Sequence, residues 1–403
     1  MNQILSTAIQ EKADNNEQRA VAELKPLIIL GLEMFLALPL GLLLSQLHIG
    51  GVTWLFGGIM SGAIILQSYR IFYKHCLLPN RSVRKIGMAL VGLNVGFSVA
   101  RGNLASVASS APVFIFLTFF ILICGTIIGY IYSRLIKTNL LTAMLATVPG
   151  GVGLMSAIAA DYGRDVTLVA LVQALRVTTV VLLIPSIARV STGTYINLQT
   201  SHIQDTLLSL APSQFGFLLL ALVLGGLGAY LAGRAKIPAG DFFGALIVGI
   251  AFNPVVNWLP VPGDVNFIPP PLINLIGQML LGITIGEYWG KKPTFRGQTI
   301  AYTLMSVALT LVAGAIAAVL AMQLTSWDWL TCMLVTAPGG SAEMILVALA
   351  LDHNVEIVTA GHLMRLIAIN SSLPLWVFLF RRLEENEKLK KLELDAISFS
   401  KES

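Results

Sequence analysis

The sequence predicts an all-α polytopic membrane protein built from two inverted-topology repeats. Hydrophobic residues make up 56% of the 403 residues and charged residues 12%, against roughly 45–50% and about 25% in ordinary globular domains. The apolar residues are grouped in runs of about twenty, the length that crosses a bilayer core. One hydrophobic stretch also occurs twice, about 190 residues apart. Internal duplication of this kind is typical of secondary transporters, in which two related halves form one path.

The repeated stretch has the same length in both halves. L-T-A-M-L-A-T-V-P-G-G-V-G-L-M (141–155) returns as L-T-C-M-L-V-T-A-P-G-G-S-A-E-M (330–344). In both halves an arginine and then a proline follow in register, and upstream I-G-M-A-L-V-G-L-N-V-G (86–96) returns as I-G-Q-M-L-L-G-I-T-I-G (276–286). The duplication therefore covers most of each half.

Each repeat is predicted to contain five spans and one broken or re-entrant helix. The spans expected in the first half are 26–47, 51–67, 86–100, 111–133 and 167–188. Those in the second half are 213–232, 242–258, 271–289, 299–322 and 358–380.

The rest of the chain is divided accordingly. Residues 1–25 lack the basic and apolar regions of a signal peptide, so they are expected to be a cytoplasmic N-terminal tail. Membrane repeats are predicted at 26–190 and 213–380, joined by an extracytoplasmic linker at 191–212. The charged residues 381–403 are expected to form a cytoplasmic C-terminal tail.

Positive charges favour an inverted arrangement of the repeats, because Lys and Arg accumulate in cytoplasmic loops. The loop after the second span is rich in Lys and Arg, whereas its counterpart at 259–270 has none. The loop after the third span carries only Arg101, whereas its counterpart carries Lys291, Lys292 and Arg296. Charge thus changes sides at equivalent loops, as an inverted duplication predicts.

The two P-G-G segments are predicted to break helices within the membrane. Proline removes a backbone donor, glycine favours non-helical conformations, and matched interruptions in two halves indicate a transporter's binding site. The alternative is a packing kink or a hinge. The substrate-binding candidates here are Thr147, Pro149, Gly150 and Gly151, with Thr336, Pro338, Gly339 and Gly340 in the second half.

Arg176 and Arg365 lie mid-span at equivalent positions, and ionisable residues there are functional candidates. Each follows a polar residue by three positions, Gln173 and His362, which places both side chains on one helical face. Arginine suits carboxylate or phosphate groups, so both are substrate-binding candidates. The alternative is that each arginine caps nearby carbonyls or pairs with an acid. The candidate acids are Glu343, Asp161 and Asp352.

Coupling or gating is predicted for acids without a counterpart in the other half. Glu343 stands where the first half has Leu154, and Glu33 lies within the first span. Each is a candidate proton carrier or cation ligand, or alternatively neutralises an arginine. Gln173, His362, Asn94 and Thr284 are further candidates for lining or gating the path.

Glycines at four-residue spacing in the upstream repeat are expected to allow close helix packing. They are Gly92 and Gly96 in the first half, and Gly282 and Gly286 in the second.

The doubled T-x-P-G-G motif, with its later Arg and Pro, resembles the AbrB-duplication family of bacterial inner-membrane proteins. The resemblance runs over about residues 27–383. It implies a multi-pass protein of the bacterial inner membrane with both termini cytoplasmic. Some members carry labels such as ammonia monooxygenase or regulator of gene expression, which these residues do not support. A small DNA-binding regulator shares the name, but nothing in this sequence resembles that domain.

The expected function is secondary active transport or export of a small anionic organic solute, coupled to H⁺ or Na⁺. The alternative is a membrane sensor or regulator of gene expression with a transporter-like body. A membrane oxygenase is the least favoured, because the histidines form no cluster with carboxylates at metal-ligand spacing. We therefore expect no enzymatic activity, cofactor, metal or nucleic acid. The partners are the solute and the lipid bilayer, while a homo-oligomer stays open.

Overall fold

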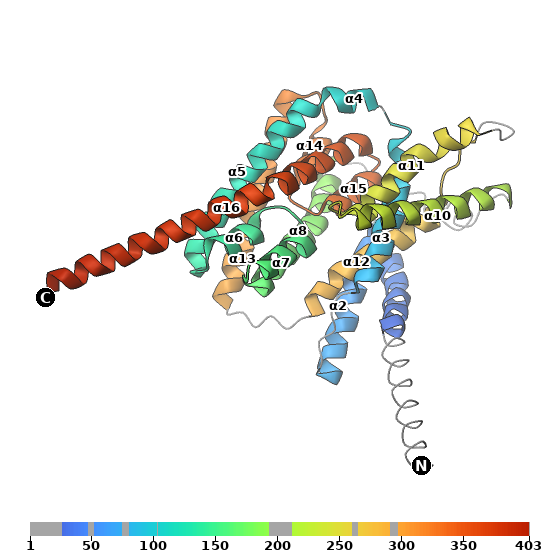
Figure 1. Cartoon of the computed structure of the whole chain (residues 1–403). Helices are drawn as coiled ribbons and strands as arrows, with labels where there is room; N and C mark the ends of the chain where they lie inside the picture. The colour runs from blue at the N-terminus through green and yellow to red at the C-terminus, as the bar shows by residue number, and fades with distance from the viewer. Residues whose placement is uncertain are drawn as a thin grey trace, which may run out of the picture.

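The computed structural model describes residues 26–46, 52–74, 80–102, 104–192, 212–259, 265–290 and 297–402, and these ranges contain helices and no strand (Figure 1). The first half comprises the helix Pro26–Gln46, α2 (Thr53–Tyr73), α3 (Arg81–Val99), α4 (Leu104–Ser109), α5 (Ala111–Ile136), α6 (Leu140–Thr147), α7 (Val152–Asp161) and α8 (Val166–Thr192). The second comprises α10 (Pro212–Arg234), α11 (Gly240–Trp258), α12 (Pro271–Glu287), η2 (Tyr288–Gly290), α13 (Gly297–Leu324), α14 (Trp329–Thr336), α15 (Ser341–Ala350) and α16 (Val355–Glu402).

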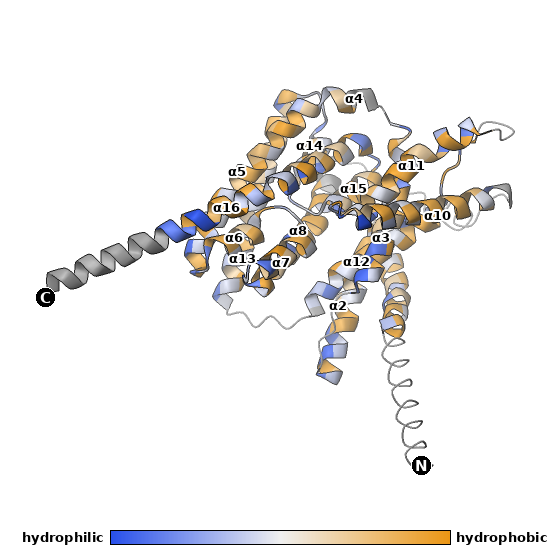
Figure 2. Cartoon of the chain, in the orientation of Figure 1, coloured by the Kyte–Doolittle hydropathy of each residue, from blue (hydrophilic) through white to orange (hydrophobic). Residues whose placement is uncertain are grey.

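Eight of the described helices are long and apolar enough to cross a membrane. Their outward faces carry large exposed apolar side chains, such as Phe35, Phe119 and Leu219, and Figure 2 shows apolar residues along most of their length. This confirms an all-α polytopic membrane protein. Of the other two expected spans, α3 is less apolar and α12 is shorter, and both pack inside the bundle. The orientation of the repeats across a membrane stays a prediction.

Several helices extend beyond the predicted spans. α2 continues to Tyr73, and α3 begins at Arg81 instead of residue 86. The earlier start of α3 has a local cause, because the Asn80 side chain accepts hydrogen bonds from the N–H groups of Ser82 and Val83. Such a cap stabilises a helix start even in a polar sequence.

The C-terminal segment is helical, with no break between the last span and the predicted tail. α16 runs from Val355 to Glu402 and includes Pro374 in its interior, as α8 includes Pro185. Figure 1 shows α16 leaving the bundle as one long rod. Of the other predicted segments, the N-terminal tail and most of the linker, residues 1–25 and 193–211, lie outside the described residues.

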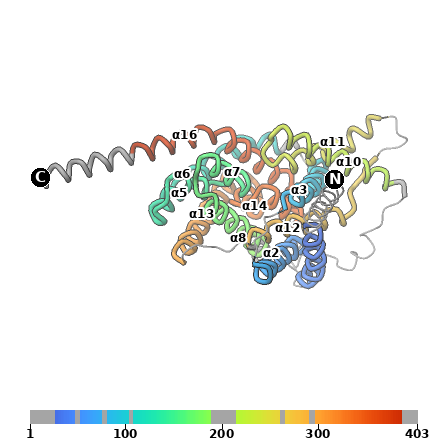
Figure 3. Tube along the Cα trace, turned by 60° about the horizontal axis from the view of Figure 1, so that its bottom comes forward, coloured from blue at the N-terminus to red at the C-terminus, as the bar shows by residue number. Residues whose placement is uncertain are grey.

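The helices fall into two groups, each drawn from both halves, and Figures 1 and 3 show them side by side. In one, the Gly-packed group, α2 packs along α12 and α3 along α11, with the helix Pro26–Gln46 and α10 outside them. In the other, the broken-helix group (α5–α8 and α13–α16), α5 packs along α13, and α8 and α16 contact broken helices of the opposite half. α3 connects the groups through contacts with α15 and α16.

Glycines bring the helices of the Gly-packed group into backbone contact. A Cβ atom at Gly282 would meet the carbonyl oxygen of Leu55 and lie 3.0 Å from the Cα of Gly58. On the equivalent pair, a Cβ atom at Gly96 would lie 2.9 Å from the Cα of Gly249. The packing role predicted for these glycines is therefore confirmed, and it fixes α2 against α12 and α3 against α11.

Replacing Gly282 by alanine is expected to lower the thermal unfolding midpoint of the purified protein. The added methyl group meets backbone, which cannot move aside, and overpacking of this kind costs about 1–3 kcal/mol. Gly226→Ala in α10 is the matched control, because a Cβ atom there meets nothing within 4 Å. An unchanged midpoint for Gly282→Ala would contradict the close packing of α2 and α12.

Candidate functional site

Both P-G-G segments break their helices, as predicted. α6 ends at Thr147 and α7 begins at Val152, and α14 and α15 end and begin at the equivalent residues. The threonine before each break forms a hydrogen bond with a neighbouring helix. The Thr147 hydroxyl lies 3.1 Å from the Gly125 carbonyl oxygen of α5, and the Thr336 hydroxyl lies 3.0 Å from that of Gly314 in α13.

The two buried arginines bind the carboxyl ends of the broken half-helices. Arg176 Nη1 donates to the Thr147 carbonyl at 2.8 Å, and Arg365 Nη1 donates to that of Ala337 at 2.9 Å. These are carbonyls that a helix end leaves without an intrahelical partner. A positive charge there also suits the negative end of the helix dipole.

The polar residues three positions before the arginines complete this arrangement. Gln173 Nε2 donates to the Leu145 and Val148 carbonyls and Gln173 Oε1 accepts from Arg176 Nη2 at 2.6 Å. In the second half, His362 Nδ1 accepts from Arg365 Nη2 at 2.6 Å, so Nε2 carries the proton donated to the Leu334 carbonyl.

Of the roles considered for the arginines, the geometry shows carbonyl capping. Among the described residues, no carboxylate forms an ion pair with either arginine. The charge of Arg365 acts on Arg176, although the two guanidinium groups bind separate broken helices. Arg176 is 2% exposed, and of the two arginines only Arg365 lines the cavity described next.

That cavity, of about 360 Å³, lies between the Gly-packed group and the broken-helix group. Both P-G-G segments form part of its wall. The residues predicted from the sequence that line it are Pro149, Gly150, Gly151, Gly339, Gly340, Arg365, Glu343 and Thr284. The structure therefore brings the two breaks, which are far apart in the sequence, to one space.

Half of the predicted site residues lie away from this wall. Thr147, Thr336, Arg176, Gln173 and His362 are buried behind the breaks, where their polar groups bond helix carbonyls. Pro338 and Asn94 do not line the cavity, and Glu33 lies in another part of the Gly-packed group, beside α2. The threonine hydroxyls and the two Nη atoms of Arg176 support the broken helices, whereas Arg176 Nε has no hydrogen-bond partner among the described residues.

The amino ends of the two inner half-helices differ. The first residues of α7 and α15 both face the cavity, and neither Gly151 nor Gly340 provides a side-chain cap. In the second half, the Glu343 carboxylate folds back against Gly340. In the first half Leu154 stands in its place, and a Cβ atom at Gly151 or Gly153 would meet nothing within 4 Å. The start of α7 thus lies beside open space in the cavity.

Three charged residues on the cavity wall, Arg84, Lys236 and Asp241, are not among the predicted site residues. Arg84 of α3 donates to the Tyr288 hydroxyl at 2.7 Å, and the charges of Glu343 and Asp241 act on it. Lys236, in the turn before α11, also lines the wall. In the sequence, Arg84 is one of the basic residues in the loop after the second predicted span. Its place next to the second P-G-G segment depends on packing between the halves.

A family comparison agrees with this architecture. The family model described as "Transition state regulatory protein AbrB" matches residues 54–381, which include both P-G-G segments. The chain belongs to this family.

Two relatives extend the comparison. An "Uncharacterized protein YhjN" of Bacillus subtilis (strain 168) is 29% identical over 332 residues, covering 79% of this chain and 84% of the relative. A "Putative regulator AbrB" of Escherichia coli (strain K12) is 26% identical over 297 residues, covering 72% and 80%.

The outer half-helices of this family member begin at capping side chains. Asn139 accepts from the Thr142 N–H at 2.8 Å at the start of α6. Asp328 accepts from the Leu330 and Thr331 N–H groups at the start of α14. Only the inner half-helices, α7 and α15, begin without such a cap.

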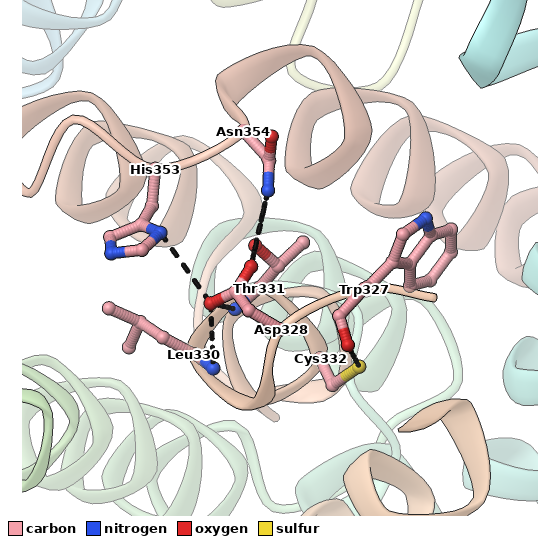
Figure 4. A network of polar contacts seen from close by, with 7 residues as sticks. All are labelled: Trp327, Asp328, Leu330, Thr331, Cys332, His353 and Asn354. Atoms are coloured by element: carbon pink, nitrogen blue, oxygen red, sulfur yellow. Dashed lines mark hydrogen bonds and ion pairs between the residues drawn. The ribbon is translucent and has the colours of Figure 1, made fainter. Parts of the chain in front are cut away.

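Asp328 also joins the start of α14 to the turn before α16 (Figure 4). Its carboxylate accepts from the Thr331 hydroxyl and from Asn354 Nδ2, and His353 Nδ1 lies 3.5 Å away. Partial burial raises the pKa of Asp328, but the hydrogen bonds from Thr331 and the nearby His353 outweigh it and hold the pKa below its ordinary value.

Because the pKa of Asp328 is lower in the folded protein, the carboxylate stabilises the fold above the unfolded-state pKa, near 3.9. This contribution is lost as the pH falls through the lower folded-state pKa. We expect Asp328→Asn to lower the thermal unfolding midpoint at neutral pH and to flatten its fall below about pH 4. Thermal unfolding between pH 7 and pH 3 measures both effects, with the surface variant Glu385→Gln as control. Parallel curves for Asp328→Asn and the wild type would contradict this role.

Proposed function

We propose that the chain is a secondary active transporter or exporter of a small anionic organic solute that binds at the amino end of α7. The observation that carries the proposal is the start of this helix, which faces open cavity space with no side-chain cap and no acid. The first N–H groups of a helix have no intrahelical partner, and together with the dipole they attract anions.

The charges on the cavity wall support an anion as the solute. Three basic residues, Arg84, Lys236 and Arg365, line it together with two acids, Asp241 and Glu343. Glu343 lies against the α15 end and interacts with Arg84. The wall therefore carries a net positive charge, and the uncapped helix end on it, the amino end of α7, belongs to the first half.

The division into two helix groups supports alternating access. A solute held between two bodies that move against each other reaches one side of the membrane at a time. The cavity lies at the boundary between the Gly-packed and broken-helix groups. Coupling to H⁺ or Na⁺, the inverted orientation of the repeats, the cytoplasmic termini and the bacterial inner membrane belong to this proposal.

A thermal-stability screen of the purified protein against organic acids, amino acids, amines and inorganic ions tests the proposal. A ligand at a hundred times its dissociation constant stabilises by roughly 2.7 kcal/mol if it binds only the folded state. We expect organic anions to raise the unfolding midpoint and to be moved across vesicles containing the protein. Stabilisation by cations or neutral solutes alone would contradict the proposal.

Gly153→Leu is expected to abolish this stabilisation and to lower solute flux by about tenfold or more, the equivalent of 1.4 kcal/mol of lost binding. The new side chain would occupy the open space at the start of α7, and it favours the helix more than glycine does. The unfolding midpoint without solute is therefore expected not to fall. Gly226→Leu, in open space on α10, controls for the exchange itself, and equal solute binding by both variants would place the site elsewhere.

The second candidate function is a membrane sensor or regulator, and one contact favours it. Arg164, in the turn between α7 and α8, binds Glu384 through two hydrogen bonds of 3.3 and 2.9 Å. Glu384 lies on the same helix, α16, as the cavity residue Arg365. A change at the cavity therefore has a continuous route to the end of the chain. The "Putative regulator AbrB" relative carries this function in its name.

Glu384→Gln separates the two candidates, because it removes one charge from the Arg164 pair and leaves the cavity wall intact. Under the transporter proposal, flux and solute affinity are expected to match the wild type. Under the sensor alternative, a solute-dependent change in gene expression is lost in cells that carry the variant. Glu385→Gln, one residue along on an exposed face, is the control for both measurements.

A further inference from the structure

Two carboxyl groups are buried together outside the solute cavity. Glu33 lies in the helix Pro26–Gln46 and is 1% exposed, and Glu287 is the last residue of α12 and is 3% exposed. Both adjoin the same stretch of α2, because the Ser61 hydroxyl binds the Glu33 carbonyl and a Cβ atom at Gly286, the residue before Glu287, would lie 2.8 Å from the Ala63 nitrogen. Neither lines the cavity between the helix groups.

The contacts of this pair are few. Glu287 Oε2 accepts the Asn80 N–H at 2.8 Å. The Ser61 hydroxyl of α2 donates to the backbone carbonyl of Glu33, at 2.6 Å, and not to its side chain. Glu33 Oε1 is buried without a hydrogen-bond partner among the described residues. A buried acceptor in this state is costly, and the cost is greatest when the carboxyl group is ionised.

The equivalent position in the other repeat is apolar. Phe97 follows Gly96 as Glu287 follows Gly286 in the repeated sequence. Phe97 packs with Ala221, Phe252 and Phe267 in an apolar cluster between α3, α10 and α11. The fold therefore closes this junction without charge in one repeat, so the two carboxyl groups are not required for packing.

From these observations we propose that Glu33 and Glu287 form one proton-binding site in which at least one of the two buried carboxyl groups holds a proton. Two ionised carboxylates at close range in an apolar site repel each other, so one of them keeps its proton. A proton on Glu33 also removes a charge whose burial without a partner is costly. Intramembrane acids of this kind are typical of proton relays.

Other titratable groups lie on the surrounding elements. Glu33 and Glu287 are the charged residues of their own helices. Those of the neighbouring elements are Tyr69, Arg70 and Tyr73 on α2, Lys74 after it, Arg81, Arg84 and Lys85 on α3, and Tyr288 on η2. Arg84 is bound to Tyr288 on the cavity wall, and Arg70 lies nine residues beyond Ser61, about 13 Å along the helix.

The position of the pair suits it to couple proton binding to solute movement. Thr284 and Tyr288, which flank Glu287 along the chain, face the cavity. The coupling role rests on the proposed transport function. Proton binding itself does not, and a measurement that needs no solute tests it.

Infrared spectroscopy of the purified full-length protein at neutral pH reads protonated carboxyl groups directly. We expect a carboxylic-acid C=O band in the wild type that shifts in D₂O and disappears on raising the pH. Glu33→Gln and Glu287→Gln are each expected to weaken or shift it, and the double variant is expected to remove it. Glu385→Gln, which replaces an exposed carboxyl group of α16, is expected to retain the band.

Three results would overturn the proton site: no such band in the wild type, a band unchanged in both variants, or a band that appears only when Na⁺ is removed. The last would identify a sodium site instead. Should one glutamine variant fail to fold, the other and the pH titration of the wild type still decide. An intact band with no solute flux would leave the proton site standing and contradict transport alone.

Discussion

The hydrogen bonding of the broken helices is the constraint on which the rest of the structure depends. A break in an apolar helix releases backbone carbonyl and N–H groups that have no water to bind. The carboxyl ends are satisfied from within the protein, by Arg176 with Gln173 and by Arg365 with His362. Because these side chains come from α8 and α16, each broken helix needs the long helix of its own half behind it. The amino ends of the inner half-helices, α7 and α15, face the cavity instead. The chemistry of the site therefore follows from how the breaks are supported.

The duplication gives the two breaks a common geometry, and single substitutions give them different chemistry. Where the second half has Glu343, which covers the start of α15, the first half has Leu154 and an open start to α7. Likewise Glu287 stands opposite Phe97. The repeats are therefore alike in support and unlike in ligands. A site between two halves of this kind has one preferred orientation for its solute, although the framework around it is nearly symmetric.

Comparison of the repeats within the sequence was sufficient to predict the breaks, most spans and the close packing at Gly96 and Gly282. These features depend on local periodicity, on proline and glycine, and on matched positions. Arg84, Lys236 and Glu287 could not be assigned in this way, because their positions at the cavity or beside Glu33 depend on contacts between the halves. For the arginines, the sequence left capping and solute binding open. Capping and solute binding both need an arginine at the same position. Only the location of the nearest backbone carbonyl distinguishes the two roles.

One stretch of each repeat has kept the same length. The stretch from α6 through α7 to the start of α8 matches the stretch from α14 through α15 to the start of α16 residue for residue. Outside this stretch the number of residues that separates equivalent positions changes, for example from α3 in the first repeat to its equivalent α12 in the second. Insertions and deletions since the duplication have therefore accumulated in the connecting loops and not between the outer half-helix and its supporting helix. A one-residue length change in this stretch would rotate the arginine by about 100°, away from the carbonyl that it binds. In evolutionary terms, this stretch is inherited as a unit of fixed length, whereas its side chains are free to diverge.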